Sequence, residues 1–197
     1  MKRCSWVKEN NPLYVAYHDQ EWGIPLHDER ALFELLCLET YQAGLSWETI
    51  LNKRAAFRQA FHGYDVHQAA VMTDAELEGI LQNPAVVRNR RKIYATRANA
   101  RAFLKIQAEF GNFDHYIWSF VDFTPIDNPV KDYKQMPSKT PLSEKLAKDM
   151  KRRGFEFVGP VCVYSFLQAA GLVNDHEETC DFNPARNAKT AHIIKSP

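Results

Sequence analysis

The sequence carries a repeated set of helix-start signals, and these constrain the fold more than any other feature. Asp28, Ser46 and Thr73 each stand just before a segment with apolar residues at helical spacing, and all three residue types are favoured N-caps. Glu76 follows Thr73 by three residues, which is the form of a capping box. Thr140 precedes a proline suited to the first helical position. Because no apolar–polar alternation is long enough for a sheet, we predict an all-α fold of roughly eight to ten helices.

The segments outside these predicted helices are less regular. Residues 1–27 have no clean periodicity but are dense in aromatic side chains. Residues 122–140 contain three prolines without an apolar rhythm, which predicts a long surface loop. For residues 155–158 we predict a short extended link between two helices. We expect one domain over residues 1–182, with two helical lobes as a possible subdivision, and a frayed polar tail over 183–197.

Charge and composition exclude several classes of protein. The net charge is +1, so the chain has no global field that would draw it onto nucleic acid, and such binding requires a local patch. No apolar run approaches the length of a membrane span, and the N-terminus lacks a signal-peptide core. The default expectation is therefore a cytoplasmic protein without a membrane partner. Cys37 and Cys162 lie in apolar runs and are expected to be small core residues.

Two His/Cys pairs at opposite ends of the chain form a candidate metal site. Cys4 and His18 lie near the N-terminus, and His176 and Cys180 lie four residues apart near the other end. A Cys2His2 set without an open position is the structural zinc pattern, and it would fasten the two ends together. The spacing matches no standard finger motif, so on spacing alone two exposed histidines and two unrelated thiols remain the alternative.

A second constellation lies in residues 74–104. Two predicted helices are joined by a short apolar hairpin, followed by Arg88, Arg90, Arg91 and Lys92. This resembles a helix–hairpin–helix, in which backbone N–H groups hold a DNA phosphate and basic side chains add charge. The alternative is a helix with a solvated basic face. The hairpin, Asn-Pro-Ala-Val-Val-Arg, lacks the glycines usual in that motif.

The third constellation is centred on a carboxylate among aromatics. Glu39 ends an apolar run, where a carboxylate needs a reason to be, and Trp47 follows after a bend of sequence Ala-Gly-Leu. With Trp6, Tyr17 and Trp22, these residues suit a nucleobase pocket: rings stack on the base and the carboxylate accepts from an exocyclic amine. The alternative is that the aromatics simply fill the core.

Five motifs, in the same order along nearly the whole chain, carry a family resemblance. They are Cys4-Ser-Trp6, Tyr17-His18-Asp19-x-Glu21-Trp22-Gly23, Glu39-x-x-Gln42-Ala43-Gly44-Leu45-Ser46-Trp47, Gly154-Phe-x-Phe-Val-Gly159 and Gln168-Ala-x-Gly171-Leu-Val-Asn174-Asp-His176-x-x-x-Cys180. The sequence resembles the bacterial 3-methyladenine DNA glycosylase I family, constitutive type, of the helix–hairpin–helix glycosylase superfamily.

The resemblance implies an all-α glycosylase fold with one structural Zn²⁺ per chain that ties the terminal segments together. The implied ligands are Cys4, His18, His176 and Cys180. It also implies that Glu39 and Tyr17 hydrogen-bond the excised base and that Trp47 stacks on it. The implied substrate-binding residues are Tyr17, Trp47, Trp6, Trp22 and Tyr14. It further implies that Gly44 and Leu45 lie at the DNA. Together with the basic residues after the hairpin, the predicted DNA-binding residues are Gln42, Gly44, Leu45, Arg88, Arg90 and Arg91.

The implied activity is hydrolysis of 3-methyladenine from alkylated double-stranded DNA, which leaves an abasic site and free 3-methyladenine. Glu39 is the catalytic candidate, with base recognition an equally good role for it. No lysine presents itself as a Schiff-base nucleophile, so we predict a monofunctional enzyme without a lyase step, acting as a monomer in the bacterial cytoplasm. Two alternatives remain: a non-catalytic zinc-stapled DNA-binding or adaptor protein, and a glycosylase for other alkylated purines.

Overall fold

Helices begin where the sequence places their caps. The computed structural model describes residues 1–185. Asp28 accepts a hydrogen bond from the amide of Ala31 at 2.8 Å, and Ser46 accepts one from the amide of Thr49 at 3.2 Å. The Thr73 hydroxyl accepts from the Glu76 amide, while the Glu76 carboxylate accepts from the Thr73 amide. Side chains therefore satisfy N–H groups that a helix start leaves unpaired.

The described chain is mostly helical. Its helices, including three 3-10 segments labelled η, and its strands are α1 Pro12–Gln20, α2 Glu29–Gln42, α3 Trp47–Ala60, η1 His62–Tyr64, α4 Val66–Val71, α5 Asp74–Gln82, α6 Arg90–Phe110, α7 Phe113–Trp118, η2 Ser119–Val121, β1 Ile126–Asp127, η3 Tyr133–Gln135, α8 Pro141–Arg152, α9 Pro160–Ala169 and β2 Val173–Asn174.

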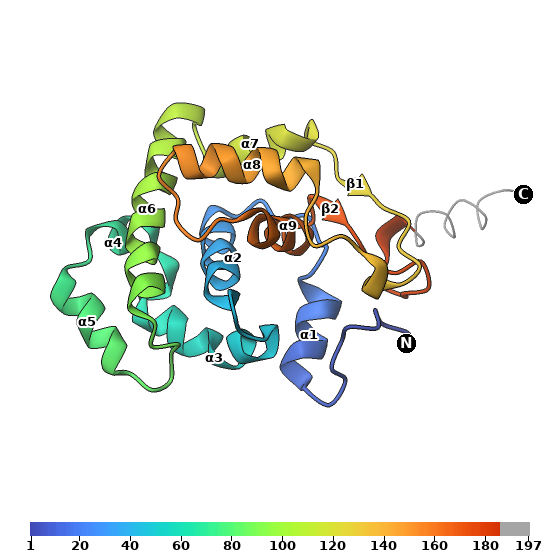
Figure 1. Cartoon of the computed structure of the whole chain (residues 1–197), viewed down its shortest axis with the longest axis horizontal. Coiled ribbons are helices and arrows are strands. Elements are labelled where there is room, and N and C mark those ends of the chain that lie inside the picture. Colours follow the sequence, from blue (N-terminus) through green and yellow to red (C-terminus); the bar gives the residue numbers. More distant parts are fainter. Residues whose placement is uncertain (186–197) are drawn as a thin grey trace, which may run out of the picture.

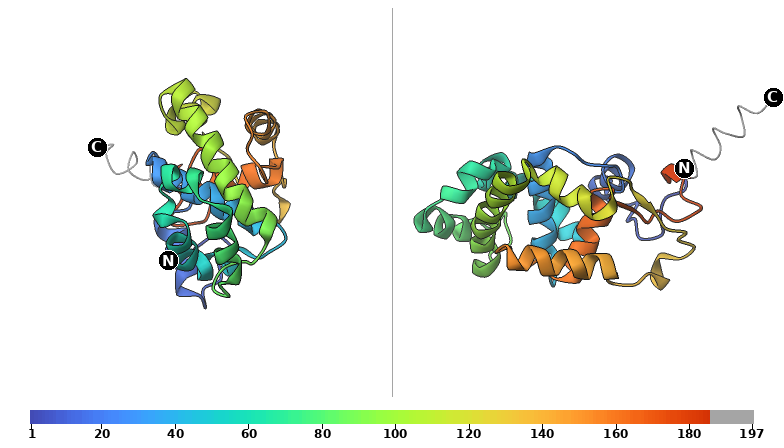
Figure 2. Two further views of the ribbon diagram at one scale, coloured as in Figure 1. Left: turned by 90° about the vertical axis from the view of Figure 1, so that its left-hand side faces the viewer. Right: turned by 90° about the horizontal axis from the view of Figure 1, so that it is seen from above.

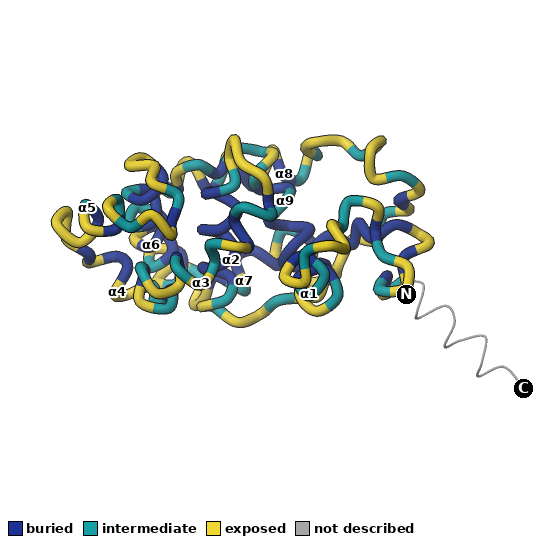
Figure 3. The backbone as a smooth tube through the Cα atoms, turned by 90° about the horizontal axis from the view of Figure 1, so that it is seen from below, coloured by how far each residue is buried: buried dark blue, intermediate teal, exposed yellow. Residues whose placement is uncertain are grey.

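Helix α2 forms the centre of the molecule. Every residue from Leu32 to Tyr41 is buried, which is expected of a helix covered on all sides. Helices α3, α6 and α9 pack against it. Figure 1 shows α4 to α6 at one end of the molecule, and α1 with the described ends of the chain at the other. The view from above in Figure 2 shows the same elongated arrangement, and the other view in that figure looks along the long axis. Figure 3 shows the buried backbone concentrated along the middle of the molecule.

Two parts of the sequence hold regular structure that its pattern does not reveal. Residues 1–27 contain α1, whose inward-facing residues are Tyr14, Tyr17 and His18 rather than an aliphatic stripe. The signal that could have located this helix is Asn11-Pro12, because Asn11 caps the amides of Leu13 and Tyr14 and a proline follows it.

The predicted surface loop over residues 122–140 carries β1 and η3. Strand β1 pairs in parallel with β2, with Ile126 opposite Val173 and Asp127 opposite Asn174. A further bridge joins Val130 to Glu177. Strands of two residues are too short to produce an alternation, so the prediction that no sheet exists was wrong for this small element.

The segment near the end of the described chain is anchored to the rest of the molecule through Asn183. Asn183, placed by the sequence in the frayed tail, is 5% exposed and donates to the backbone oxygen of His176 at 3.1 Å. The rest of that predicted tail, residues 186–197, lies outside the described residues. Within residues 1–185, no helix is both long enough and apolar enough to cross a membrane.

Candidate functional site

The aromatic residues singled out in the sequence surround one small cavity with Glu39. The cavity has a volume of about 190 Å³, and we call it the base cavity; its lining residues are Trp6, Tyr14, Tyr17, Trp22, Glu39, Gln42, Trp47, Tyr133, Ser165 and Gln168. Sites for drug-sized ligands occupy about 300–1,000 Å³. The base cavity is smaller, so its size suits a single heterocyclic base rather than a whole nucleotide.

Glu39 is the carboxylate of this cavity. It lies near the end of the buried helix α2 and is 4% exposed. Burial raises the pKa of Glu39 to about 8, because removal from water penalises the charged form. The free site therefore holds mainly a neutral carboxylic acid at pH 7.

Several polar atoms of the base cavity have no protein partner. Within residues 1–185, four buried side-chain atoms lack a hydrogen-bond partner, and three belong to cavity residues: Trp6 Nε1, Glu39 Oε2 and Trp47 Nε1. Buried polar groups are normally paired, so each exception requires an explanation. These three atoms can be satisfied by a polar ligand in the cavity.

The aromatic rings are arranged as walls rather than as a stack. The Tyr17 and Trp47 ring centroids lie 5.1 Å apart and are tilted by 52°. Trp6 meets Trp22 edge to face at 4.8 Å, and Tyr14 lies edge-on to Trp6 at 5.7 Å. Rings that pack edge to face leave the face of at least one ring available to a flat ligand.

The two distant His/Cys pairs meet in one buried cluster. One ligand atom from each of Cys4, His18, His176 and Cys180 lies within 4.8 Å of the others. The Sγ of Cys180 is 3.6 Å from Nε2 of His18 and 3.5 Å from Nδ1 of His176. A tetrahedral zinc, with bonds of roughly 2.3 Å to sulfur and 2.0–2.1 Å to nitrogen, places such ligands about 3.6 Å apart. The donor set and its spacing therefore fit a metal ion.

The remaining ring nitrogens of the cluster are also held. His18 Nδ1 lies 2.8 Å from a carboxylate oxygen of Asp19, and Arg3 pairs with that carboxylate through two nitrogens. Nε2 of His176 lies 3.2 Å from the backbone oxygen of Trp22. Such partners orient metal-binding imidazoles. A hydrogen bond between the two thiols raises the pKa of Cys4 and lowers that of Cys180.

The cluster and the base cavity share a wall. The Trp22 ring lies 4.6 Å from the ring of His176, and the Trp6 ring lies 5.3 Å from that of His18. A Cβ at Gly23 would lie 2.7 Å from Nε2 of His176, so only glycine permits this close approach. The terminal segments thus position two indoles of the cavity.

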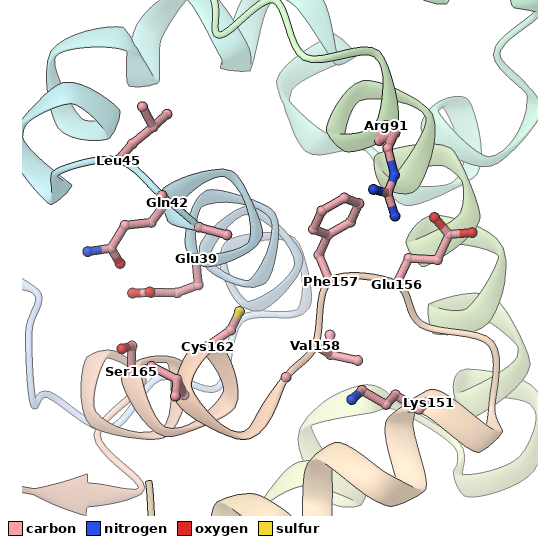
Figure 4. A pocket seen from close by; sticks show the side chains of 14 residues that line it. Glu39, Gln42, Leu45, Arg91, Lys151, Glu156, Phe157, Val158, Cys162 and Ser165 are labelled. Atoms are coloured by element: carbon pink, nitrogen blue, oxygen red, sulfur yellow. The ribbon is translucent and has the colours of Figure 1, made fainter. Parts of the chain in front are cut away.

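A wider groove of about 930 Å³ adjoins the base cavity and shares Glu39, Gln42 and Ser165 with it. We call it the outer groove (Figure 4). Its other lining residues are Ala43, Gly44, Leu45, Arg91, Lys151, Glu156, Phe157, Val158, Gly159, Val161 and Cys162. Gly44 has φ 79°, which favours glycine, and the bend leaves Leu45 39% exposed at the groove.

The predicted hairpin joins α5 to α6 beside this groove. Lys53 of α3 supports it by donating to the backbone oxygens of Pro84 and Ala85, each at 3.1 Å. Arg88 is exposed. Arg91 lines the outer groove.

Two basic residues of the run at 88–92 are engaged within the protein. Arg90 pairs with Glu78, and its guanidinium lies 4.7 Å from the Tyr94 ring centroid. Lys92 is 5% exposed and donates to the backbone oxygens of Tyr41, at 2.8 Å, and Ala43. The expectation that Lys92 adds charge for DNA was wrong, because its ammonium group is occupied at the carboxyl end of α2.

Comparisons with known proteins identify the family of this chain. Residues 6–184 match the family model for methyladenine glycosylase. The chain belongs to the methyladenine glycosylase family. It is 45% identical over 180 residues to DNA-3-methyladenine glycosylase 1 of Escherichia coli K12, covering 91% of this chain and 96% of that protein. It is 46% identical over 178 residues to DNA-3-methyladenine glycosylase of Haemophilus influenzae Rd, covering 90% and 96%.

A solved structure extends the comparison to the fold. A single-residue variant of 3-methyladenine DNA glycosylase I, solved in complex with 3-methyladenine, superposes with a TM-score of 0.90 at 38% identity. The match covers 93% of this chain and 98% of that one. The predicted family and its helical glycosylase fold are therefore confirmed.

For this methyladenine glycosylase family member, sequence reasoning missed several residues around the site. Tyr133 enters the base cavity from η3, where no local pattern points to it. Ser165 and Gln168 line the cavity from α9. Cys162, expected in the core, is only partly buried and lines the outer groove. Ser165 and Gln168 are polar residues within the otherwise apolar sequence of α9. This interruption is the signal that could have indicated that α9 lines the cavity.

Proposed function

We propose that this chain excises 3-methyladenine from alkylated double-stranded DNA by hydrolysis and leaves an abasic site. The observation that carries the proposal is the base cavity, in which a buried carboxylate with a free oxygen lies among indole and phenol rings. A base inside duplex DNA cannot reach such a cavity, so the target nucleotide must rotate out of the stack. Family membership and the relatives named for 3-methyladenine support this choice of base.

The charge of the lesion explains how the cavity selects it. Methylation at N3 places a positive charge on adenine while the base is still attached to the sugar. A cationic ring stacked on the indole of Trp47 gains a cation–π attraction of about 0.5–2 kcal/mol that neutral adenine lacks. Glu39 would accept a hydrogen bond from the exocyclic amine, and Tyr17 would contact another edge. An ionised Glu39 adds further preference for the cation.

The same charge makes the leaving group good. The glycosidic bond of the alkylated base is already weakened, so the enzyme need not protonate the base. Its task is to extrude the nucleotide, hold the cationic base and favour an oxocarbenium-like sugar while water attacks. Among the described residues lining the base cavity, Glu39 is the only carboxylate. We assign it to base recognition and to electrostatic support of this step.

The outer groove is the proposed path of the DNA. Leu45 would enter the gap left by the rotated nucleotide, with Gly44 and Gln42 beside it, because the bend at the end of α2 exposes this side chain. Arg88 and Arg91 would add phosphate contacts without reading sequence. The pairing of Arg90 with Glu78 makes its contribution smaller than that of its two neighbours.

We further infer that Cys4, His18, His176 and Cys180 hold one Zn²⁺ per chain. A closed Cys2His2 set offers no position for substrate, so a bound zinc supplies structure and not chemistry. It would fasten α1 to the segment after β2 and thereby hold Trp6 and Trp22 in the cavity wall. We further propose that the enzyme acts as a monomer in the bacterial cytoplasm.

The direct test is to incubate duplex DNA treated with a methylating agent and to identify the released bases by chromatography. We expect free 3-methyladenine from the wild type and much less from Glu39→Gln and Trp47→Ala. Release mainly of 3-methylguanine or 7-methylguanine would identify a glycosylase for other purines. Binding of DNA with no released base would identify an adaptor, and either result would overturn the proposal.

A further inference from the structure

The loop between α8 and α9 holds an aromatic residue in a strained conformation. Phe157 has φ 57°, in the left-handed region where a bulky side chain is a genuine outlier. Such conformations persist only when the surrounding structure imposes them, and they gather at functional sites. The sequence predicted an extended link over residues 155–158, so this conformation is a correction of that prediction.

The surrounding structure imposes the conformation from both sides. Asn99, which is fully buried in α6, accepts from the amide of Glu156 at 2.7 Å and donates to its backbone oxygen at 3.2 Å. Glu156 and Phe157 are flanked in the sequence by two core residues, Phe155, which is 3% exposed, and Val158, which is 0% exposed. With its neighbours anchored in this way, the Phe157 ring is turned away from the core.

The ring is presented to the outer groove. Phe157 is only partly buried and lines that groove together with Leu45. Figure 4 shows it between the end of α2, which leads to Leu45, and Arg91 on α6. The Arg91 guanidinium lies 5.6 Å from the ring centroid, within the range of a cation–π contact. Core packing does not require this placement, because the buried positions on either side already anchor the loop.

We propose that Phe157 is a DNA-stacking residue, whose ring packs against a base left exposed beside the gap when the target nucleotide rotates out. The inference rests on the proposed function and adds a second DNA-facing side chain, which approaches the gap from α8–α9 while Leu45 approaches from α2–α3. Stacking on an aromatic ring tolerates any sequence, because every base has a π-face. Arg91 places a positive charge beside the ring, where the phosphate backbone passes.

The test compares variants of Phe157 in binding to a duplex that contains a tetrahydrofuran abasic analogue. Loss of one base–aromatic stack should weaken binding by on the order of tenfold in Phe157→Ala. Phe157→Leu should show a similar loss, because it keeps an apolar side chain but no ring, whereas Phe157→Trp should bind like the wild type. Binding of free 3-methyladenine should not change, since Phe157 is not on the wall of the base cavity.

Phe123 offers a matched control. It is also a phenylalanine with φ 57° and is 55% exposed, but it lies outside both cavities. Phe123→Ala should leave duplex binding unchanged. Phe157→Gly removes the ring and also relieves the backbone strain, so it should lose duplex affinity while its Tm stays level or rises. This variant separates the loss of stacking from damage to the fold.

Three results would overturn the proposal: duplex affinity within twofold of wild type in Phe157→Ala, wild-type affinity in Phe157→Leu, or an equal loss in Phe123→Ala. The binding measurement needs no excision. A wild type that binds the abasic duplex through Phe157 but releases no 3-methyladenine would therefore contradict the proposed function and not the stacking role. Normal release of 3-methyladenine by the wild type, together with unchanged duplex binding in the Phe157 variants, would contradict the stacking role and not the proposed function.

Discussion

The base cavity and the His/Cys cluster lie side by side, but they differ in whether their buried polar atoms have hydrogen-bond partners within the protein. In the cluster, each histidine uses the ring nitrogen that points away from the other cluster residues to contact a protein oxygen. For His18 this partner is the Asp19 carboxylate, and for His176 it is the backbone oxygen of Trp22. In the cavity, Glu39 and the two indoles of Trp6 and Trp47 each keep one buried polar atom without a partner. The first region is internally closed, and the second is prepared for a ligand.

This difference assigns separate roles to the two regions. A fully paired polar network stabilises one arrangement of the chain, whereas unpaired buried groups reduce stability and are retained where a ligand completes them. Damage to the cluster should therefore act first on folding. Damage to the cavity should act first on excision, with little loss of stability.

Loss of the proposed zinc should have the largest effect. We expect Cys180→Ser, or treatment with a strong chelator, to lower the free energy of unfolding by several kcal/mol, because binding energy at a structural zinc site is folding energy. Thermal unfolding and zinc content by atomic spectroscopy would measure this. Cys162→Ser is the control, since that thiol lies on the outer groove. Equal stability of Cys180→Ser and wild type would remove the structural role of the cluster.

Two buried carboxylates on α2 sharpen the comparison. Glu34 and Glu39 are each 4% exposed, but Glu34 is paired with Arg54 and Arg58. Glu39→Gln should reduce single-turnover excision by about 10–100-fold, the range for a hydrogen bond to a charged group of roughly 1.5–3 kcal/mol. Its Tm at pH 7 should stay level or rise, because Gln replaces a group that must take up a proton on folding at that pH. Glu34→Gln should lower Tm and leave the excision rate of the folded enzyme near wild type. The reverse pattern would contradict the assignment of Glu39.

The pKa of Glu39 predicts opposite pH trends for stability and activity. Its pKa is about 8 in the folded state and 4.5 in the reference state, so the folded protein binds the extra proton. Glu39 therefore contributes stability below pH 4.5 that is lost as the pH rises through 8, by up to about 1.4 kcal/mol per pH unit. The ionised form that favours a cationic base increases over the same interval.

We therefore expect kcat/KM for excision to rise between pH 6 and 8 while the free energy of unfolding falls. Both slopes should be reduced in Glu39→Gln, as shown by excision assays and denaturant titrations at each pH. A wild-type enzyme whose kcat/KM is flat over this interval would show that ionisation of Glu39 does not limit excision.

Lys92 should give the smallest effect. Replacement by Met keeps the length of the side chain but leaves the carbonyls of Tyr41 and Ala43 without their donor and removes a cation from a helix C-terminus, which costs about 1 kcal/mol. We expect Tm to fall by a few degrees and excision to slow by a few-fold, because the adjoining bend carries Leu45. The control is Lys105→Met, at an exposed position of α6, the helix that also carries Lys92. It should change neither Tm nor the excision rate.

The outcome of the sequence predictions follows the range of the interactions involved. Caps at Asp28, Ser46 and Thr73 could be located because a cap and its partner amide lie within three residues of each other. Helix α1 was missed because its buried side is aromatic and lacks the aliphatic rhythm that periodicity detects. The strands β1 and β2 were missed because two-residue strands are defined by their pairing across 47 residues and by nothing local.

The candidate site divides in the same way. Residue types made the four residues of the cluster, Glu39 and the aromatic wall candidates, because thiols, imidazoles and a carboxylate in an apolar run carry a chemistry of their own. The family resemblance then favoured these candidates over the alternatives of unrelated thiols and core aromatics. Only the tertiary structure could show that Tyr133 and Gln168 complete the cavity, that Lys92 supports α2 and does not face DNA, and that Asn99 forces Phe157 outward. Each of these depends on burial and on a partner distant in the chain. The sequence thus determined which chemistry was available, and packing decided which groups were left open to use it.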